Sequence, residues 1–311
     1  MNTFNEPRFT DNDAARAYLE NLRWPDGPIC PHCGTVNHAY AIKPKGTYRC
    51  AEAACRGNFT VTMNSPMERS HIALHKWVLA FHLVCSSKKG MSAHQLHRTL
   101  GITYRSAWFM EHRIRECMRA GGLAPPIGGT GRTVEADETY FGTIAKEEMM
   151  PKKPGRGRRA GIRRSAYRAV VALVERGGSV RSFHVAQADQ FTVDAIMRAN
   201  IARESHIHTD ESGLYRLAPW TFASHEAVKH SAKEYVRGDV HTNTIEGYFS
   251  IFKRGMKGIY QHCGEKHLHR YLAEFDFRYN TRTKLGFNDG DRAALAVKNA
   301  DGKRLTYRQP H

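Results

Sequence analysis

The sequence has no long apolar run. Nothing in its 311 residues approaches the roughly 20 consecutive apolar residues that a membrane-spanning helix needs. The first 20 residues, MNTFNEPRFTDNDAARAYLE, are polar and include acids, unlike a secretory signal peptide. We therefore expect a soluble cytoplasmic protein, long enough for two or three small units with a sizeable core.

Acidic residues are scarce relative to basic ones. The chain has 30 Asp and Glu against 47 Lys and Arg, which gives a formal net charge of +17 and a pI of about 9.7. Such an excess predicts a partner with many negative charges. Because no run can span a membrane, we expect nucleic acid and no membrane partner.

Cysteine is sparse and unevenly placed, unlike the spread framework of a secreted disulfide protein. Four of the seven cysteines fall within one short stretch, in two pairs: Cys30, Cys33, Cys50 and Cys55. Two such pairs on two turns can supply the four thiolates of a structural Zn²⁺ site. We predict one zinc ion, in preference to an accidental grouping of thiols. His32 and His38 are less favoured substitute ligands.

Composition divides the chain into five stretches. Residues 1–62 contain the clustered cysteines, and residues 63–120 have apolar residues at helical spacing. The segment 121–131, GGLAPPIGGTG, is expected to be a linker. Residues 132–285 alternate strand-like and helical runs, and residues 286–311 are expected to form a polar tail.

The stretch SAHQLHRTLGITYRSAWFMEHRIR has the pattern of a helix-turn-helix. Ser92 can cap a first helix, Gly101 can end it, and Thr103 can cap a second helix. The second helix would present Tyr104 and Arg105 at its N-terminal end, where such motifs contact a DNA groove. A plain αα-hairpin is the alternative. The net charge and the neighbouring cysteines favour DNA binding.

A basic run, KKPGRGRRAGIRRSAYR, occupies residues 152–168 without any acid. Its proline and glycines predict a loop. Such a loop is often only a solvated surface segment, but its position between two predicted strands favours contact with DNA phosphates. The residues expected in this contact are Lys152, Lys153, Arg156, Arg158, Arg159, Arg163 and Arg164.

Residues 132–285 have the pattern of an α/β unit. TVEADETYFG is strand-like, AYRAVVALVER and SVRSFHVAQAD flank a Gly-Gly turn as a hairpin, FTVDAIMRANI is helical, and SHIHTDE is a short strand. A helical zone then runs, with breaks, from about Thr242 to Arg282. This order predicts a mixed sheet with flanking helices.

Three carboxylates fall on elements that can meet in such a unit. Asp137 lies in the first strand, Asp210 ends a second strand, and Glu246 lies on the following helix. Hard divalent cations prefer oxygen ligands, and two such ions can drive displacement at a phosphodiester. We therefore predict that these acids hold two Mg²⁺ or Mn²⁺ ions.

Glu246 has a second interpretation. Asn243 followed three residues later by Glu246 fits a capping box. However, Asn243, Glu246, Ser250 and Lys253 fall within an arc of roughly 80° on the helix, beside a separate apolar stripe. We expect Glu246 to be the third ligand, with Asn243 as the alternate, and Lys253 to bind a DNA phosphate.

The whole ordered set of motifs resembles the ISXO-type insertion-sequence transposases. The resemblance covers nearly everything from Asp26 to about Arg282. Its motifs are CPHCG with the paired cysteines, FTVTMNSPMERSHIALHKWVLAFHL, the helical segment 92–116, VEADETYFG, HTDESGLY, HTNTIEGYFSIFKRG and HLHRYLAEFDFRYNTR.

The resemblance implies an RNase H-like α/β core preceded by a zinc ribbon and a helix-turn-helix region. By carry-over, Asp137, Asp210 and Glu246 form a DDE-type triad, with Lys253 and Arg254 next to DNA. It further implies binding of terminal inverted repeats, metal-dependent cleavage, and joining of the 3′-OH to target DNA. A homo-oligomer in the synaptic complex and a nucleoid-associated location are also expected.

Three other functions fit parts of the sequence. An RNase H-like nuclease or resolvase would cleave without joining. A zinc-ribbon and helix-turn-helix regulator would bind DNA without catalysis. A tyrosine recombinase would use His267, Arg270 and Tyr307 in metal-free covalent chemistry, but no second arginine motif supports it.

Overall fold

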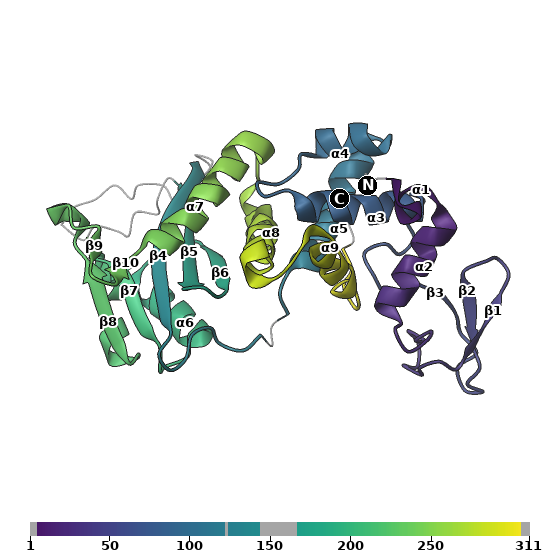
Figure 1. Cartoon of the computed structure of the whole chain (residues 1–311), viewed down its shortest axis with the longest axis horizontal. Coiled ribbons are helices and arrows are strands. Elements are labelled where there is room, and N and C mark those ends of the chain that lie inside the picture. Colours follow the sequence, from purple (N-terminus) through teal and green to yellow (C-terminus); the bar gives the residue numbers. More distant parts are fainter. Residues whose placement is uncertain (1–4, 122–123, 144–166, 306–311) are drawn as a thin grey trace, which may run out of the picture. The chain divides into compact units, whose positions relative to one another are not determined.

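The computed structural model describes residues 5–121, 124–143 and 167–305. It divides into two compact units, one of Met1–Arg119 with Thr281–His311 and one of Ala120–Asn280. We call them unit 1 and unit 2, and Figure 1 labels their elements. Within the described residues, no helix is long and apolar enough to cross a membrane.

Unit 1 begins with helices α1 (Pro7–Thr10) and α2 (Asn12–Arg23), followed by a three-stranded antiparallel sheet. The strands are β1 (Ala39–Ile42), β2 (Thr47–Cys50) and β3 (Asn58–Thr60). Trp24 packs edge-on against Tyr48 and Phe59, at centroid distances of 5.5 and 5.7 Å. The range 1–62 therefore contains two helices ahead of the small sheet that carries the cysteines.

The helical part of unit 1 contains α3 (Leu74–Ser86), α4 (Ala93–Leu100) and α5 (Tyr104–Met118). The predicted caps are confirmed. The Ser92 side chain accepts a hydrogen bond from the Gln95 amide, and Thr103 accepts one from the Ser106 amide. Gly101 ends α4 with a φ of 58°, a left-handed conformation that glycine adopts without steric cost.

The C-terminal range 286–311, expected to be a polar tail, contains helix α9 (Asp289–Lys298) after the short turn η8 (Thr283–Leu285). The buried residues of α9 include Ala293, Ala296 and Val297. Arg292 Nη1 donates a hydrogen bond to the carbonyl oxygen of Cys85 at the end of α3, 3.1 Å away. Small apolar residues made this packing helix hard to recognise in the sequence.

Unit 2 is built on a five-stranded mixed sheet in the order β6-β5-β4-β7-β8. These strands are β4 (Thr133–Thr143), β5 (Tyr167–Glu175), β6 (Val180–Val185), β7 (His206–Asp210) and β8 (Ser224–Val228). β4, β5 and β6 pair antiparallel, whereas β4, β7 and β8 pair parallel. The predicted mixed sheet and the β5–β6 hairpin are thus confirmed.

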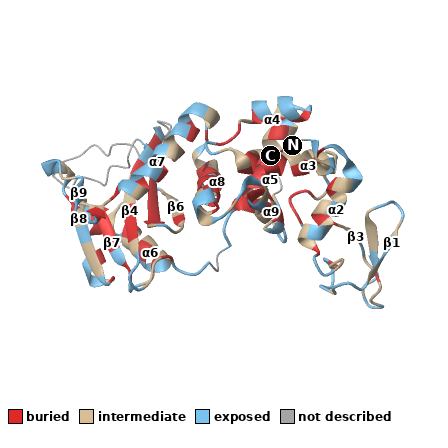
Figure 2. Ribbon diagram, viewed as in Figure 1, coloured by how far each residue is buried: buried red, intermediate tan, exposed pale blue. Residues whose placement is uncertain are grey.

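Helices cover both faces of this sheet. The remaining elements of unit 2 are α6 (Gln190–Asn200), η3 (Gly213–Tyr215), η4 (Ala218–Trp220), η5 (His230–Ala232), a small hairpin of β9 (Val236–Arg237) and β10 (Val240–His241), α7 (Asn243–Gly255), a π-helical turn (Met256–Tyr260), η7 (Glu265–His267) and α8 (Leu268–Asn280). Figure 2 shows buried residues concentrated in β4 and β5 and on the inner sides of the helices.

Alternate residues of the central strands face two separate apolar clusters. Val170, Ala172 and Val174 of β5 pack with residues of α7 and α8, among them Ile245 and Phe252. The intervening Val171 and Leu173 pack with α6 on the other face. The predicted segment 121–131 is partly integrated, because Ile127 is buried and pairs with Ile201 as an isolated β-bridge.

Candidate active site

The register of the sheet brings Asp137 and Asp210 side by side. In the parallel pairing of β4 and β7, Glu135 lies opposite His208. Asp137 and Asp210 each lie two residues further along, so they continue the same register. Because side chains alternate along a strand, both aspartates project from the sheet face that carries Glu135. The sequence predicted that Asp137 and Asp210 lie close together, and the parallel pairing of β4 with β7 accounts for it.

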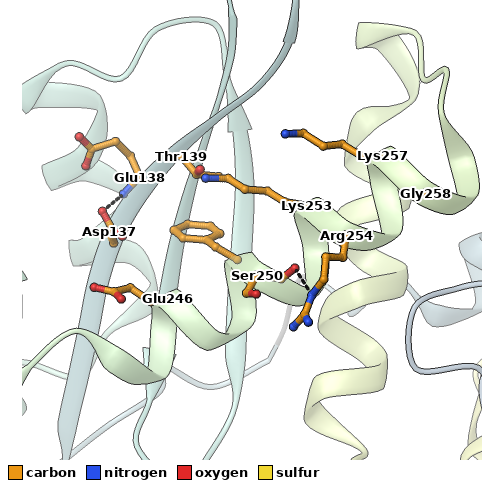
Figure 3. A pocket seen from close by; sticks show the side chains of 10 residues that line it. Asp137, Glu138, Thr139, Glu246, Ser250, Lys253, Arg254, Lys257 and Gly258 are labelled. Carbon is orange, nitrogen blue, oxygen red and sulfur yellow. Dashed lines mark hydrogen bonds between the residues drawn. The ribbon is translucent and has the colours of Figure 1, made fainter.

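Helix α7 covers this same face and carries Glu246. Its apolar residues Ile245, Phe249, Phe252 and Met256 are buried, as the helical stripe predicted. Figure 3 shows the Glu246 and Asp137 side chains approaching one another between α7 and β4. Burial of the apolar stripe therefore orients Glu246 toward the strand that bears Asp137.

The predicted capping box of Asn243 and Glu246 is wrong. The helix starts at Asn243, so Thr242 is the N-cap residue. The Glu246 carboxylate accepts a hydrogen bond from Thr242 Oγ1 at 3.0 Å, and the Glu246 amide donates to the Thr242 carbonyl. Asn243 is exposed. The register of the cap differs by one residue because β10 ends at His241, immediately before it.

The α7 N-terminus is capped by a residue from another element. Glu135, in β4, is fully buried and accepts hydrogen bonds from the amides of Thr244 and Ile245 at 2.9 and 3.0 Å. Arg176 Nε donates to the same carboxylate at 2.7 Å. The sequence placed Glu135 on the same face as Asp137 but gave it no role. Its contacts lie 109 residues away along the chain, so no local pattern signals them.

Charge accumulates around Asp137. Burial, together with the nearby charges of Glu138, Asp210 and Glu246, raises the pKa of Asp137 to about 8. Burial also raises the pKa of Glu138, although a hydrogen bond from Tyr215 Oη at 2.7 Å opposes the shift. Glu138 was missed as a candidate site residue. Four carboxylates thus influence one another, and a bound cation would relieve their repulsion.

A pocket of about 690 Å³ joins Asp137, Glu138 and Glu246 to a row of cations, and Asp210 lies outside its lining. Figure 3 shows Lys253 and Lys257 extending from the helix side across from β4. The complete lining is Asp137, Glu138, Thr139, Glu246, Phe249, Ser250, Lys253, Arg254, Lys257 and Gly258. Glu246 lines this pocket and Asn243 does not. Lys257 continues the predicted stripe by one more turn, so the same periodicity could have identified it.

The carboxylates around Asp137 have suitable chemistry for hard cations, but their oxygen atoms do not lie close together. Among the described residues, no three carboxylates place a ligand oxygen each within 4.8 Å of the others. Oxygens bound to one Mg²⁺ at 2.0–2.1 Å would be closer than that limit. The donor set therefore fits the ions, and rotation of the Asp and Glu side chains would have to complete any shared ligation.

The four predicted cysteine ligands of unit 1 do converge. One sulfur each from Cys30, Cys33, Cys50 and Cys55 lies within 4.8 Å of the others. Two of the sulfur pairs are 3.7 and 3.6 Å apart. A tetrahedron with Zn–S bonds of about 2.3 Å places sulfurs roughly 3.8 Å apart, so the cluster fits zinc. His32 Nε2 instead contacts the Asn58 carbonyl at 3.2 Å, and His38 pairs with Glu52.

The predicted DNA-contacting residues have different outcomes. Tyr104 is 44% exposed at the start of α5 and stacks on His94, with ring centroids 4.2 Å apart. Arg105 is also exposed. The basic residues from Lys152 to Arg164 lie outside the described residues, as does Tyr307 of the recombinase hypothesis. DNA contact by any of these residues stays a prediction.

Comparison with known proteins gives matches to both parts of the chain. Residues 128–280 match the ISXO2-like transposase domain, and residues 10–58 match the transposase zinc-ribbon domain. Residues 128–280 thus form an ISXO2-like transposase domain, and a transposase zinc ribbon precedes it in the chain. A protein of Halobacterium salinarum, described as an uncharacterized protein in transposable element ISH50, is 28% identical over 289 residues. That alignment covers 89% of this chain and 94% of the relative.

These two domain matches and the relative from an insertion element confirm the resemblance found in the motifs. The transposase domain covers β4, β7 and α7, the three elements that carry Asp137, Asp210 and Glu246. The zinc-ribbon match, residues 10–58, contains all four clustered cysteines. The four-cysteine cluster and this match support a structural Zn²⁺, and both domains imply DNA binding.

Proposed function

We propose that this transposase cleaves DNA at the terminal inverted repeats of its element and joins the freed 3′-OH ends to target DNA. The observation that carries the proposal is the shared register of Asp137 and Asp210 on adjacent parallel strands, under the helix that bears Glu246. We further propose that the mixed sheet is an RNase H-like core. Its antiparallel β4–β6 followed by the parallel β7 and β8 support this assignment.

Asp137, Asp210 and Glu246 would hold two divalent cations, Mg²⁺ or Mn²⁺. When bound, such ions activate an oxygen nucleophile and stabilise the leaving oxygen of an in-line displacement. Glu246 is favoured over Asn243 as the third ligand because it lines the pocket and contributes to the charge felt by Asp137. Glu138 adds a fourth negative charge beside the site.

The cations of α7 would hold the substrate beside the acids. Lys253 and Lys257 line the same pocket as Asp137, and Arg254 lies next to them. A lysine ammonium group neutralises a phosphate without fixing its orientation. This suits contacts to the DNA backbone, which carry no sequence information. The scissile phosphodiester would thus lie between the carboxylates on one side and the cationic side chains of Lys253 and Lys257 on the other.

Two displacements at phosphorus would complete the reaction. In the first, water attacks the phosphorus, and the bond to the 3′ oxygen breaks to leave a 3′-OH and a 5′-phosphate. In the second, that 3′-OH attacks a target phosphodiester, forms a new ester bond and releases a target 3′-OH. The same site can serve both steps because each exchanges one oxygen for another at phosphorus.

Binding of the element ends would use surfaces outside this pocket. The exposed Tyr104 and Arg105 at the start of α5 suit groove contacts, and the basic run from Lys152 to Arg164 suits phosphate contacts. Because an element has two ends, we propose that a homo-oligomer holds both in the synaptic complex.

The test uses labelled duplexes that carry the inverted-repeat ends from the DNA flanking the gene, with a supercoiled plasmid as target. Wild-type chain with Mg²⁺ is expected to nick at the repeat boundary and to form covalent joint molecules. Asp137→Ala, Asp210→Ala and Glu246→Ala should each lose both products on the order of 10³-fold while keeping end binding. Glu204→Gln, at an exposed acid of unit 2, is the control.

Other outcomes distinguish the competing functions. Nicking without joint molecules would indicate a nuclease or resolvase. Binding without any nicking, unchanged by Asp137→Ala, would indicate a regulator. Full activity in EDTA would favour a metal-free recombinase. Each of these results would overturn the proposed function.

A further inference from the structure

The carboxylate of Glu135 occupies the N-terminus of α7. Thr244 N and Ile245 N donate to its Oε2 at 2.9 and 3.0 Å, and Thr244 Oγ1 donates to its Oε1 at 2.8 Å. The first amides of a helix lack partners within the helix and carry a partial positive charge. A buried carboxylate therefore satisfies them here. This helix end is not available to a DNA phosphate.

Arg176 fixes the other side of the same carboxylate. Its Nε donates to Glu135 Oε1 at 2.7 Å. Its two remaining nitrogens donate to the carbonyls of Asp239 and His241, at 2.7 and 2.9 Å, and Nη2 also lies 3.0 Å from His208 Nδ1. One arginine thus connects β4 and β7 to the hairpin that leads into α7.

The sequence positions of these residues make the connection important. Glu135 precedes Asp137 by two residues on β4, and His208 precedes Asp210 by two on β7. Thr244 and Ile245 immediately precede Glu246 on α7. The hydrogen bonds of Glu135 and Arg176 therefore link β4, β7 and α7 at positions one or two residues from Asp137, Asp210 and Glu246. Ordinary packing of the apolar α7 stripe would not by itself fix the helix along its axis.

We propose that Glu135, held by Arg176, is a positioning residue that sets the place of Glu246 relative to Asp137 and Asp210. This inference rests on the proposed function of the three acids as cation ligands. Buried groups that orient a ligand typically change metal affinity by 10–100-fold when they are replaced, and small misplacements of a catalytic group can cost 10²-fold in rate.

A second buried carboxylate in unit 2 provides a matched control. Glu274 is also fully buried and pairs with Arg278, four residues later on α8. It connects no acid-bearing element to another. Glu274→Gln therefore removes a buried charge and destabilises unit 2 without disturbing the α7 N-terminus.

The experiment compares wild type, Glu135→Gln, Thr244→Val and Glu274→Gln as full-length chains. Three quantities are measured: hydrogen exchange of the Thr244 and Ile245 amides, Mn²⁺ binding by electron paramagnetic resonance, and cleavage as a function of Mg²⁺ concentration. Glu135→Gln should speed exchange of both amides roughly tenfold and weaken Mn²⁺ binding about 10–100-fold. Its cleavage should recover partly at high Mg²⁺.

The controls separate positioning from general stability. Thr244→Val removes only the hydroxyl donor, so it should fold and shift each quantity in the same direction by a smaller factor. Glu274→Gln should lower the Tm but leave Mn²⁺ affinity and exchange at Thr244 within about twofold of wild type. Glu135→Gln and Thr244→Val with wild-type exchange and Mn²⁺ affinity would overturn the inference. A wild-type chain that never cleaves DNA would instead overturn the proposed function.

Discussion

The two groups of candidate metal ligands, the cysteines of unit 1 and the carboxylates of unit 2, differ in how closely their ligand atoms approach one another. The four cysteine sulfurs of unit 1 lie within 4.8 Å of one another, whereas no three described carboxylates of unit 2 meet that limit. The cysteines come from two turns within 26 residues of sequence. The acids come from β4, β7 and α7, which span more than 100 residues.

The difference reflects the charge and the task of each site. Thiols are small, weakly polar groups that can gather in a buried cluster at little cost. Carboxylates brought equally close would repel, and burial together with the neighbouring carboxylates already raises the pKa of Asp137 to about 8. A closed sulfur site suits a structural ion. A looser oxygen site with an adjoining pocket leaves room for substrate.

The largest effect is expected at the sulfur site. Cys30→Ser combined with Cys33→Ser should reduce bound zinc from about one per chain to none. Because structural zinc contributes on the order of 10 kcal/mol to small domains, the β1–β3 sheet should unfold. Metal analysis and hydrogen exchange of residues 39–60 measure this. Cys85→Ser, at a buried thiol outside the cluster, should retain the zinc.

The second prediction concerns which side chain completes the acid site. Glu246→Ala should lower strand transfer on the order of 10³-fold, equivalent to about 4 kcal/mol. Asn243→Ala should lower it less than tenfold, because Asn243 is exposed and does not line the pocket. Joint-molecule formation on inverted-repeat ends is the measurement. The opposite ranking would transfer the third ligand position to Asn243.

Asp276 offers a buried acid that is surrounded by donors instead of other acids. Burial raises its pKa to about 6, although hydrogen bonds from Tyr248 and Ser182 lower it. A raised folded-state pKa means that the folded chain keeps a proton that the unfolded chain releases. As the pH rises from about 4 to about 6, the contribution of Asp276 to the free energy of unfolding should therefore decrease by at most about 3 kcal/mol. Above about pH 6 it should stay constant.

The measurement is urea unfolding of wild type and Asp276→Asn between pH 4 and pH 7. The free energy of unfolding of wild type, relative to the variant, should decline as the pH rises through this window. A difference that is constant, or that grows with pH, would show that Asp276 does not hold its proton in the folded chain.

The smallest effect is expected along the cationic wall of the pocket. Lys253→Gln and Lys257→Gln should each reduce the slope of log affinity against log salt concentration by about one, because each ammonium neutralises about one phosphate. Binding of an inverted-repeat duplex at several salt concentrations measures this slope. Lys229→Gln, at an exposed lysine that does not line the pocket, should leave it unchanged.

Local patterns were sufficient to predict much of both units. Strand-like composition identified β4, β5 and β7, the Gly-Gly turn identified the β5–β6 hairpin, and side-chain caps identified α4 and α5. The same periodicity separated the buried stripe of α7 from the stripe that lines the pocket. These features depend on neighbouring residues, so a single sequence contains them.

The features that escaped prediction depend on long-range contacts or weak apolar signals. Glu135 accepts hydrogen bonds from the first turn of α7 across 109 residues, and the N-cap of that helix is Thr242 instead of the expected Asn243. Glu138 follows Asp137 directly, but the alternation along β4 assigned the site to the face of Glu135, Asp137 and Thr139, so Glu138 was not selected. Helix α9 buries mainly small residues such as Ala293 and Ala296, which gave too little hydrophobic pattern to detect.

Thiophilic rescue of Asp137→Cys asks whether the side chain at this position ligates the divalent cation. The variant is assayed for cleavage of an inverted-repeat duplex in Mg²⁺ and in Mn²⁺, with duplex binding and Tm as checks. A thiolate binds Mg²⁺ poorly and softer Mn²⁺ better. If Asp137 is a cation ligand, the variant should not cleave in Mg²⁺ and should regain cleavage in Mn²⁺. A folded, DNA-binding variant that is equally active in both ions, or inactive in both, would contradict it.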